Sequence, residues 1–187
     1  MTGPRSFLSH APEETEALGE ALGRVLEAGA VVALSGELGA GKTAFVRGLA
    51  RGLEVEGAAS SPTFTLMQEH AGRLPLYHFD AWMAGREASF LEGGGADYLG
   101  GEGVCAVEWA ERIEDYLPED RLEVRLSHRT PTERLLVLEA RGGASQRALA
   151  ALEPPPGPRE TPPEEHARGS SPESGEPRGS APVQERP

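Results

Sequence analysis

The sequence predicts an α/β fold, in which a mixed β-sheet lies between helices in a three-layer sandwich and antiparallel strands extend the sheet. Three observations lead to this prediction. A short β-branched apolar run is followed by a glycine-rich loop and an amphipathic helix. Further apolar runs alternate with helical patterns through the middle of the chain. Two segments within residues 121–140 alternate apolar with charged residues, as half-exposed strands do.

The chain begins with a short strand and a helix. We expect the strand at Ser6–Ser9 and the helix from Pro12 to Ala28, ended by Gly29. Pro12 suits a first helical turn, because its missing N–H would have no helical partner there. The apolar stripe that should face the core consists of Leu18, Leu22, Val25 and Leu26.

The next segment fits G-x-x-x-x-G-K-[ST], the phosphate-binding P-loop. It has the strand before it, Ala30–Ser35, and the helix after it, Thr43–Leu53, that this motif needs. The glycines let the loop curl and aim its N–H groups at phosphate oxygens. The fold expected is therefore of the P-loop NTPase type. The candidate nucleotide-binding residues of the loop are Gly36, Glu37, Leu38, Gly39, Ala40, Gly41, Lys42 and Thr43.

The basic residue of the motif stands out in the composition. Lys42 is the only lysine among 18 lysines and arginines, so arginine is used wherever else a cation is needed. A compact ammonium group is what a P-loop requires. We expect Lys42 to reach the β- and γ-phosphates of a nucleotide, and the Thr43 hydroxyl to ligate Mg²⁺.

The rest of the chain supplies further strands and helices. A loop of small and hydroxyl residues at 57–65 precedes a hairpin, Leu66–His70 with Leu74–Asp80, joined by a turn. Helical patterns are expected at Ala84–Leu91 and over most of Trp109–Leu117. The remaining expected strands lie within Gly103–Glu108 and at Arg121–His128 and Arg134–Ala140.

Two acids follow strands and are the candidates to serve the phosphates. Glu108 comes after four small or apolar residues, the Walker B pattern, and Asp80 ends the second strand of the hairpin. Chemistry in open α/β sheets gathers at the carboxyl ends of strands. We assign Glu108 to Mg²⁺, directly or through water, and Asp80 to Mg²⁺ or to the attacking water. Spacing alone does not separate these roles.

Four other residues have two interpretations each. Thr63 and Thr65 belong either to a loop that closes on the γ-phosphate or to a simple turn. His78 is either a metal ligand with Asp80 or a packed histidine, and the second is favoured because no third ligand is evident. Trp109 either stacks on a ring or lies in the core or an interface, and we favour the latter.

Composition excludes several classes of protein. A formal net charge of -12 over 187 residues argues against holding nucleic acid mainly through the chain's own phosphate contacts, so no stable DNA binding is expected. The single cysteine, Cys105, should be a buried apolar residue. No stretch is apolar enough to span a bilayer and no signal peptide is evident, so we expect no membrane and a cytoplasmic location.

The composition changes after about residue 143. From Pro154 to Pro187 lie 10 of the 16 prolines and no aromatic residue, so little apolar area is available to offset chain entropy. We therefore expect a P-loop ATPase domain at residues 1–143 and a disordered Pro/Gly/Glu-rich tail at residues 144–187. The tail either docks a partner or is merely tolerated, and the second is favoured.

Four motifs in this order resemble the TsaE (YjeE) family of bacterial ATPases. They are GELGAGKT at 36–43, SPTFTL at 61–66, HFD at 78–80, and EW at 108–109 followed by ERI at 111–113. A P-loop alone is shared by many families, but the joint order and spacing are far more specific. The resemblance covers about residues 6–141.

The resemblance implies an ATPase acting in the formation of threonylcarbamoyladenosine beside the tRNA anticodon. Such proteins bind the TsaB–TsaD pair, reach tRNA only through that complex, and use ATP and Mg²⁺ to support its turnover, by resetting it. By matching position, Lys42 is the phosphate lysine, Thr43 the Mg²⁺ ligand, and Asp80 and Glu108 the essential acids. Arg134 falls where the family often has an arginine near the nucleotide. The first helix near residues 12–15 is a candidate for the adenine pocket, though no motif marks it.

The chain departs from the family pattern at two places. The family usually continues Leu-Tyr-Arg after Asp80, whereas this chain has Ala81-Trp82-Met83. An arginine contact made there by relatives is therefore missing or moved to Arg86. The family also has proline where this chain has Ala110. Neither change touches the phosphate site.

Two rival functions remain open and a third is disfavoured. A small-molecule kinase of the P-loop class needs an arginine-rich lid, but the segment between Asp80 and Glu108 offers only Arg86. A non-catalytic nucleotide-dependent switch would not need both acids. A GTPase is disfavoured more firmly, because the guanine-reading motif Asn-Lys-x-Asp requires asparagine and the chain has none.

Overall fold

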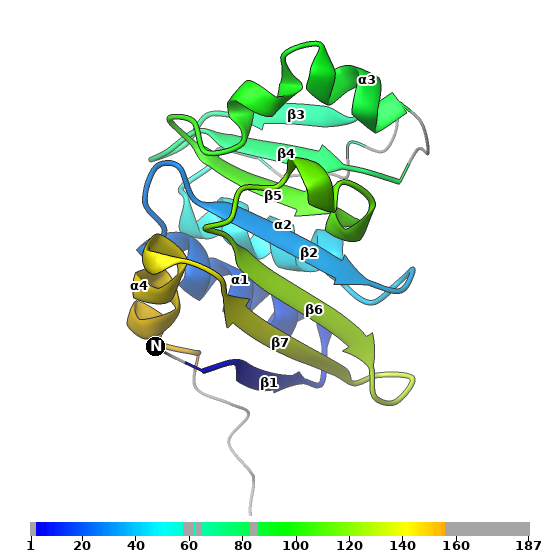
Figure 1. Ribbon diagram of the computed structural model, residues 1–187. Helices are drawn as coiled ribbons and strands as arrows, with labels where there is room; N and C mark the ends of the chain where they lie inside the picture. The colour runs from blue at the N-terminus through cyan, green and yellow to red at the C-terminus, as the bar shows by residue number, and fades with distance from the viewer. Residues whose placement is uncertain (1–2, 58–61, 63–64, 83–85, 156–187) are drawn as a thin grey trace, which may run out of the picture. The chain divides into compact units, whose positions relative to one another are not determined.

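A seven-stranded mixed sheet runs through the described residues of the computed structural model, which are 3–57, 62, 65–82 and 86–155 (Figure 1). The strands stand in the order β1-β7-β6-β2-β5-β4-β3. Their bounds are Arg5–Ser9 (β1), Val31–Gly36 (β2), Met67–His70 (β3), Leu76–Asp80 (β4), Val104–Glu108 (β5), Leu122–His128 (β6) and Arg134–Ala140 (β7).

The centre of the sheet is parallel and its edges are antiparallel. β4 pairs in parallel with β5, β5 with β2, and β2 with β6. β7 and β1 extend one edge antiparallel, and β3 extends the other. The expected hairpin is confirmed, because Met67 pairs with Phe79 and His70 with Leu76. Every residue of β5 is buried, as expected of a strand covered on both faces.

Helices lie on both faces of the sheet, which confirms the three-layer arrangement. α1 (Pro12–Val25), α2 (Lys42–Gly52) and α4 (Gly143–Ala151) pack on one face over a core that reaches from β4 to β7. In Figure 1, α1 and α2 lie behind the strands. The other face carries α3 (Arg86–Glu92) and three short 3-10 turns, Gly95–Tyr98 (η1), Ala110–Arg112 (η2) and Glu114–Tyr116 (η3).

α1 and α2 approach closely because glycines line their contact. A Cβ added to Gly48 would lie 1.9 Å from the backbone oxygen of Glu16, and one added to Gly19 would lie 2.2 Å from that of Phe45. Larger side chains at these positions would push the helices apart. The close contact fixes α2, and hence the loop before it, against α1.

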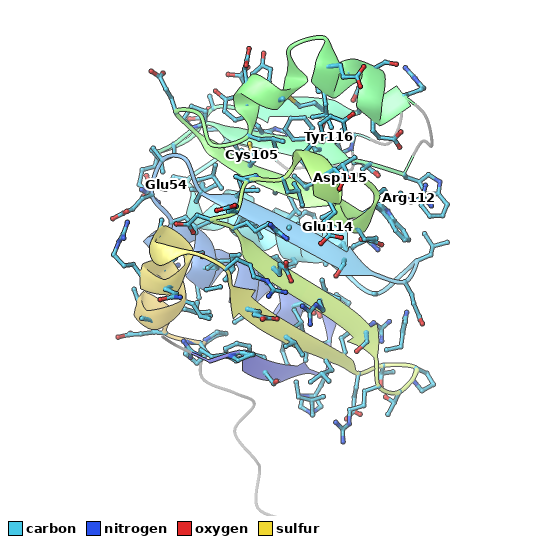
Figure 2. The ribbon with its side chains drawn as sticks, viewed as in Figure 1. Glu54, Cys105, Arg112, Glu114, Asp115 and Tyr116 are labelled. Atoms are coloured by element: carbon cyan, nitrogen blue, oxygen red, sulfur yellow. The ribbon has the colours of Figure 1, made fainter. Side chains whose placement is uncertain are left out.

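The segment after β5 differs from the expectation of a mostly helical stretch over 109–117. It forms two 3-10 turns, η2 and η3, interrupted at Ile113 with φ of -127°. Ile113 is 4% exposed and packs among the buried residues of the sheet face that carries α3, at the point where the backbone leaves the helical range. Figure 2 shows η3, with Glu114, Asp115 and Tyr116, in front of the sheet.

Cys105 behaves as the sequence predicts. Its side chain is fully buried in β5, and its thiol donates to the backbone oxygen of Tyr98 at 2.6 Å (Figure 2). Burial raises the pKa of the Cys105 thiol to about 12. The thiolate is therefore scarce at neutral pH, and the residue is suited to packing rather than to nucleophilic chemistry.

The expected domain boundary after residue 143 is wrong. Residues 143–151 form α4, whose Leu149 is fully buried, and Leu152 behind it is 2% exposed. Arg5 of β1 donates to the backbone oxygens of both leucines at 2.8 Å. The described part of the chain therefore continues past the expected boundary as packed structure. The apolar residues of this short alanine-rich piece were too few to signal a packed helix in the sequence.

Several expectations concern residues outside the described ranges. Ser61, Thr63 and Phe64 of the expected switch-like loop lie there, as do Met83 of the departure after Asp80 and the tail from residue 156. Among the described residues, no helix is both long and apolar enough to cross a membrane.

Replacing Gly48 tests the close helix contact. Gly48→Ala should lower the free energy of unfolding by about 1–3 kcal/mol, because its Cβ meets backbone that cannot yield. The matched control is Gly143→Ala, since a Cβ there would meet nothing closer than 3.9 Å. It should change stability by no more than about 0.5 kcal/mol. Urea unfolding measures both, and equal effects would contradict the contact.

Two truncations test the position of the boundary. A chain ending at Gly143 loses Leu149 and Leu152 from the core, and should be destabilised by at least about 3 kcal/mol. A chain ending at Gly157 keeps all of α4 and should unfold at the same urea concentration as the full chain. Full stability of the shorter chain would restore the boundary expected from composition.

Candidate functional site

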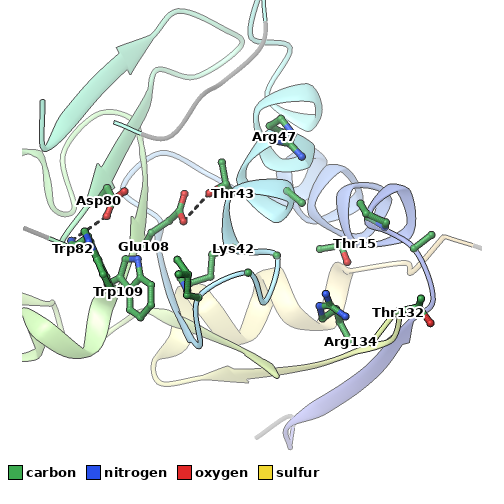
Figure 3. A pocket seen from close by; sticks show the side chains of 16 residues that line it. Thr15, Lys42, Thr43, Arg47, Asp80, Trp82, Glu108, Trp109, Thr132 and Arg134 are labelled. Atoms are coloured by element: carbon green, nitrogen blue, oxygen red, sulfur yellow. Dashed lines mark hydrogen bonds between the residues drawn. The ribbon is translucent and has the colours of Figure 1, made fainter. Parts of the chain in front are cut away.

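A cavity of about 430 Å³ opens where β2, β4 and β5 end (Figure 3). Parallel strands present their carboxyl ends at the same edge of a sheet, so the residues that follow them gather there. The cavity is lined by Ala11, Pro12, Thr15, Leu38, Gly39, Gly41, Lys42, Thr43, Ala44, Arg47, Asp80, Trp82, Glu108, Trp109, Thr132 and Arg134.

The loop between β2 and α2 has the backbone conformation that its glycines predict. Gly36 has φ of +136°, and a Cβ there would lie 2.1 Å from the Leu126 backbone oxygen. Gly41 has φ of +105° and caps α2 without a side-chain hydrogen bond. The first helical hydrogen bond runs from Phe45 N–H to the Gly41 oxygen. The preceding N–H groups and the helix dipole are thus suited to an anion.

Lys42 is folded back onto the loop. Its ammonium group donates to the backbone oxygens of Gly36 at 2.7 Å and Glu37 at 2.9 Å. It also lies 3.5 Å from the centre of the Trp109 ring. Burial lowers the pKa of Lys42, while the charges of the nearby acids act in the opposite direction. The site therefore places a nearly buried cation, 4% exposed, beside the phosphate loop.

Thr43 and Glu108 meet at the end of β5. The Thr43 hydroxyl donates to Glu108 Oε2 at 2.9 Å (Figure 3). The parallel register of β2 and β5 sets Glu108 opposite Leu34, two residues before the loop begins. Glu108 is 3% exposed. A hydroxyl and a carboxylate oxygen at this separation form the beginning of a magnesium site, because Mg²⁺ prefers oxygen ligands.

His78 also contacts Glu108, a contact that the sequence analysis missed. Its Nε2 lies 2.9 Å from Glu108 Oε1, and the side chain is fully buried in β4. The favoured view of a packed histidine therefore omitted a hydrogen bond. The two-residue spacing of His78 and Asp80 could have predicted this contact, because residues two apart on a strand share a face. Within the described part of the chain, no three side chains of His, Cys, Asp or Glu form a metal cluster.

Asp80 lies beside Glu108 on the neighbouring strand. The register of β4 and β5 pairs the two residues directly, and Asp80 is 3% exposed. One carboxylate oxygen, Oδ1, accepts the backbone N–H of Trp82 at 3.0 Å. The two predicted acids thus meet at one edge of the sheet, as the strand-end argument requires.

Trp109 packs against the core on the sheet face that carries α3, in agreement with the favoured core role, and its contacts also extend to the site. It lines the cavity, with the Lys42 ammonium over its face and the Trp82 ring 4.5 Å away between centroids. Its backbone has φ of +60°, which turns the chain sharply after β5. Arg112 donates to the Trp82 backbone oxygen at 2.7 Å and lies over the Trp82 ring. The sequence analysis expected the departure at residues 81–83 to leave the phosphate site untouched, and Trp82 shows that this expectation was wrong. No role was predicted for Arg112.

The opposite end of the cavity is formed by the first helix and the β6–β7 turn. Figure 3 shows Arg134, Thr132 and Thr15 on the side away from Glu108. The Arg134 guanidinium donates to backbone oxygens of its own turn, including Glu133 at 3.1 Å. Of the candidate region for an adenine pocket, residues 12–15, Pro12 and Thr15 line the cavity. Thr132 and Arg47 line it as well and were not singled out from the sequence.

The comparisons with known proteins identify the family. The family profile described as threonylcarbamoyl adenosine biosynthesis protein TsaE matches residues 9–136. The chain belongs to the TsaE family. Its role is therefore in the biosynthesis of threonylcarbamoyladenosine in tRNA, and the expected resemblance is confirmed.

Individual relatives agree over most of their length. The tRNA threonylcarbamoyladenosine biosynthesis protein TsaE of Treponema pallidum is 43% identical over 119 residues, covering 64% of this chain and 88% of the relative. The protein of the same name from Bacillus subtilis is 42% identical over 132 residues, covering 70% and 82%. The crystal structure of Bacillus subtilis YdiB superimposes with a TM-score of 0.68 at 36% identity, covering 81% of this chain and 95% of that one.

Membership in the TsaE family implies nucleotide binding, and the site residues fit a magnesium nucleotide. The loop offers N–H groups and an ammonium to phosphates, while Thr43 and Glu108 offer hard oxygen ligands 2.9 Å apart. These are the groups that P-loop proteins use for triphosphate and metal. The P-loop fold expected from the sequence is thus the fold of the family.

Proposed function

We propose that this chain is a Mg²⁺-dependent ATPase that acts on the TsaB–TsaD complex during formation of threonylcarbamoyladenosine in tRNA. The observation that carries the hydrolase part is the hydrogen bond between Thr43 and Glu108 at 2.9 Å, made beside the buried ammonium of Lys42. A site that only bound phosphate would not need an acid here. Two acids, Asp80 and Glu108, support hydrolysis over binding alone.

Each residue has a separate task in this proposal. The N–H groups of loop residues 36–43 and the Lys42 ammonium bind the phosphates. Thr43 and Glu108 hold Mg²⁺, which when bound neutralises charge on the phosphate oxygens. Asp80 orients a water, either one on the metal or the one that attacks the γ-phosphate. To reach the phosphates, the Lys42 ammonium must break its hydrogen bonds to the backbone oxygens of Gly36 and Glu37.

The proposed nucleotide lies along the cavity with its base away from the acids. Phosphates at the loop leave the other end for the adenosine, where Pro12, Thr15 and Arg134 line the wall. Arg134 would contact the nucleotide from the β6–β7 turn. Its guanidinium is already bound to backbone oxygens of that turn, which directs it into a defined position.

The proposed partners would raise the rate of ATP hydrolysis at a site that is slow by itself. P-loop hydrolases often need an arginine supplied by a partner to stabilise the transition state. The two arginines that line the cavity, Arg47 and Arg134, lie on the side away from the acids (Figure 3). We therefore propose slow hydrolysis alone and faster hydrolysis with TsaB–TsaD, with tRNA contacted through that complex. A net charge of -12 fits a cytoplasmic protein that does not itself bind tRNA through phosphate contacts.

Site variants test the hydrolase. Lys42→Ala and Glu108→Gln should each lower kcat for phosphate release from ATP by about 100-fold, because each removes charge stabilisation at the phosphates or metal. Glu69→Gln removes an exposed carboxylate of β3 and is the matched control, expected to equal the unsubstituted chain. Full activity in Glu108→Gln would transfer the metal role to Asp80. Rapid transfer of the γ-phosphate to a metabolite would favour a kinase.

Adding the partners tests the second part. Phosphate release by the unsubstituted chain should rise at least about tenfold with purified TsaB and TsaD present, as completion of a P-loop site by a partner requires. Glu108→Gln is the negative control, because TsaB and TsaD should not stimulate phosphate release by a chain that lacks this acid. An unchanged rate together with tight nucleotide binding would favour a switch that works by binding alone.

A further inference from the structure

A buried histidine stands behind the acid of the proposed metal site. His78 is fully buried in β4, and its Nε2 lies 2.9 Å from Glu108 Oε1. The other carboxylate oxygen, Oε2, accepts the hydroxyl of Thr43 at 2.9 Å. Glu108 therefore has a separate partner for each oxygen, one on the loop side and one within the sheet.

We propose that His78 is a positioning residue that fixes the Glu108 carboxylate for metal binding. This role rests on the proposed function of the site. A glutamate side chain has several rotatable bonds, and ordering it costs conformational entropy. A hydrogen bond to a rigid, fully buried ring removes that freedom before the metal arrives. Hydrogen bonds from surrounding groups to metal-binding carboxylates serve this purpose widely in proteins.

The hydrogen-bond inventory sets the direction of the contact. A carboxylate accepts only, so Nε2 carries the proton and donates to Oε1. The other ring nitrogen, Nδ1, is buried and has no hydrogen-bond partner among the described residues. Glu108 thus receives the one hydrogen bond that anchors this ring in place. When the Thr43 hydroxyl turns toward a metal, His78 still holds the acid.

Two amide substitutions separate positioning from simple packing. In His78→Gln the amide nitrogen reaches about as far as Nε2 and can still donate to Glu108. In His78→Asn the amide stops about where Nδ1 stands and falls short of the carboxylate. The two side chains differ by one methylene and carry the same group, so they are matched in polarity. His70→Leu controls for loss of a histidine from the adjacent strand β3, since its buried Nε2 has no hydrogen-bond partner among the described residues.

The experiment measures binding of the nonhydrolysable ATP analogue AMP-PNP by calorimetry, with EDTA and with Mg²⁺, alongside phosphate release. We expect His78→Asn to bind the analogue normally in EDTA, because Lys42 and the loop are intact. Its gain in affinity on adding Mg²⁺ should shrink about tenfold, and kcat should fall about 10–100-fold, as for other groups that support metal ligands. His78→Gln should stay within about fivefold of the unsubstituted chain on both measures, and His70→Leu should match it.

Three results would overturn the positioning role. One is an unchanged Mg²⁺ response in His78→Asn, and another is equal loss in His78→Gln and His78→Asn. The third is weaker binding of the analogue in EDTA by His78→Asn at normal thermal stability, which would place the effect outside the metal. Absence of Mg²⁺-dependent binding in the unsubstituted chain would instead refute the proposed function, and the role of His78 with it.

Discussion

Parallel pairing of β4, β5 and β2 is the constraint on which the site depends. It sets Asp80 directly beside Glu108, and Glu108 beside Leu34, two residues before the loop begins. Side chains on a strand alternate between faces, so a register slip of one residue would turn Glu108 toward the opposite face. That face is packed by α3 and the 3-10 turns. The same pairing that buries the core therefore also decides which acids meet the phosphate loop.

The helix after the loop is held as firmly as the strand before it. Glycines let α2 lie against α1 at a distance that no other residue allows, and this places residues of α1 in the cavity wall. The loop is thus anchored at one end by the central strand and at the other by a helix pair. A loop anchored at both ends keeps its N–H groups aimed without a ligand, which lowers the entropy cost of binding.

Charge is concentrated on side chains that expose little of their surface. Lys42 is 4% exposed, and Glu108 and Asp80 are each 3% exposed. Burying charges is unfavourable unless each group has hydrogen-bond or charge partners. The Lys42 ammonium has two carbonyl oxygens and the face of Trp109, and Glu108 has Thr43 and His78. These contacts explain why the neighbours of the motif residues matter as much as the motif.

The sequence by itself determined the α/β class, the strand-loop-helix around Lys42, the hairpin, and the two acids at strand ends. Each rests on local information, which is apolar periodicity or a motif of fixed spacing. Only the tertiary structure decided that His78 bonds Glu108, that Trp109 lies under Lys42, and that α4 belongs to the core. These contacts join residues about 30, 67 and more than 100 positions apart in the chain, across strands whose order no local pattern encodes. Sequence spacing carries the chemistry of a motif, whereas strand order determines what surrounds it.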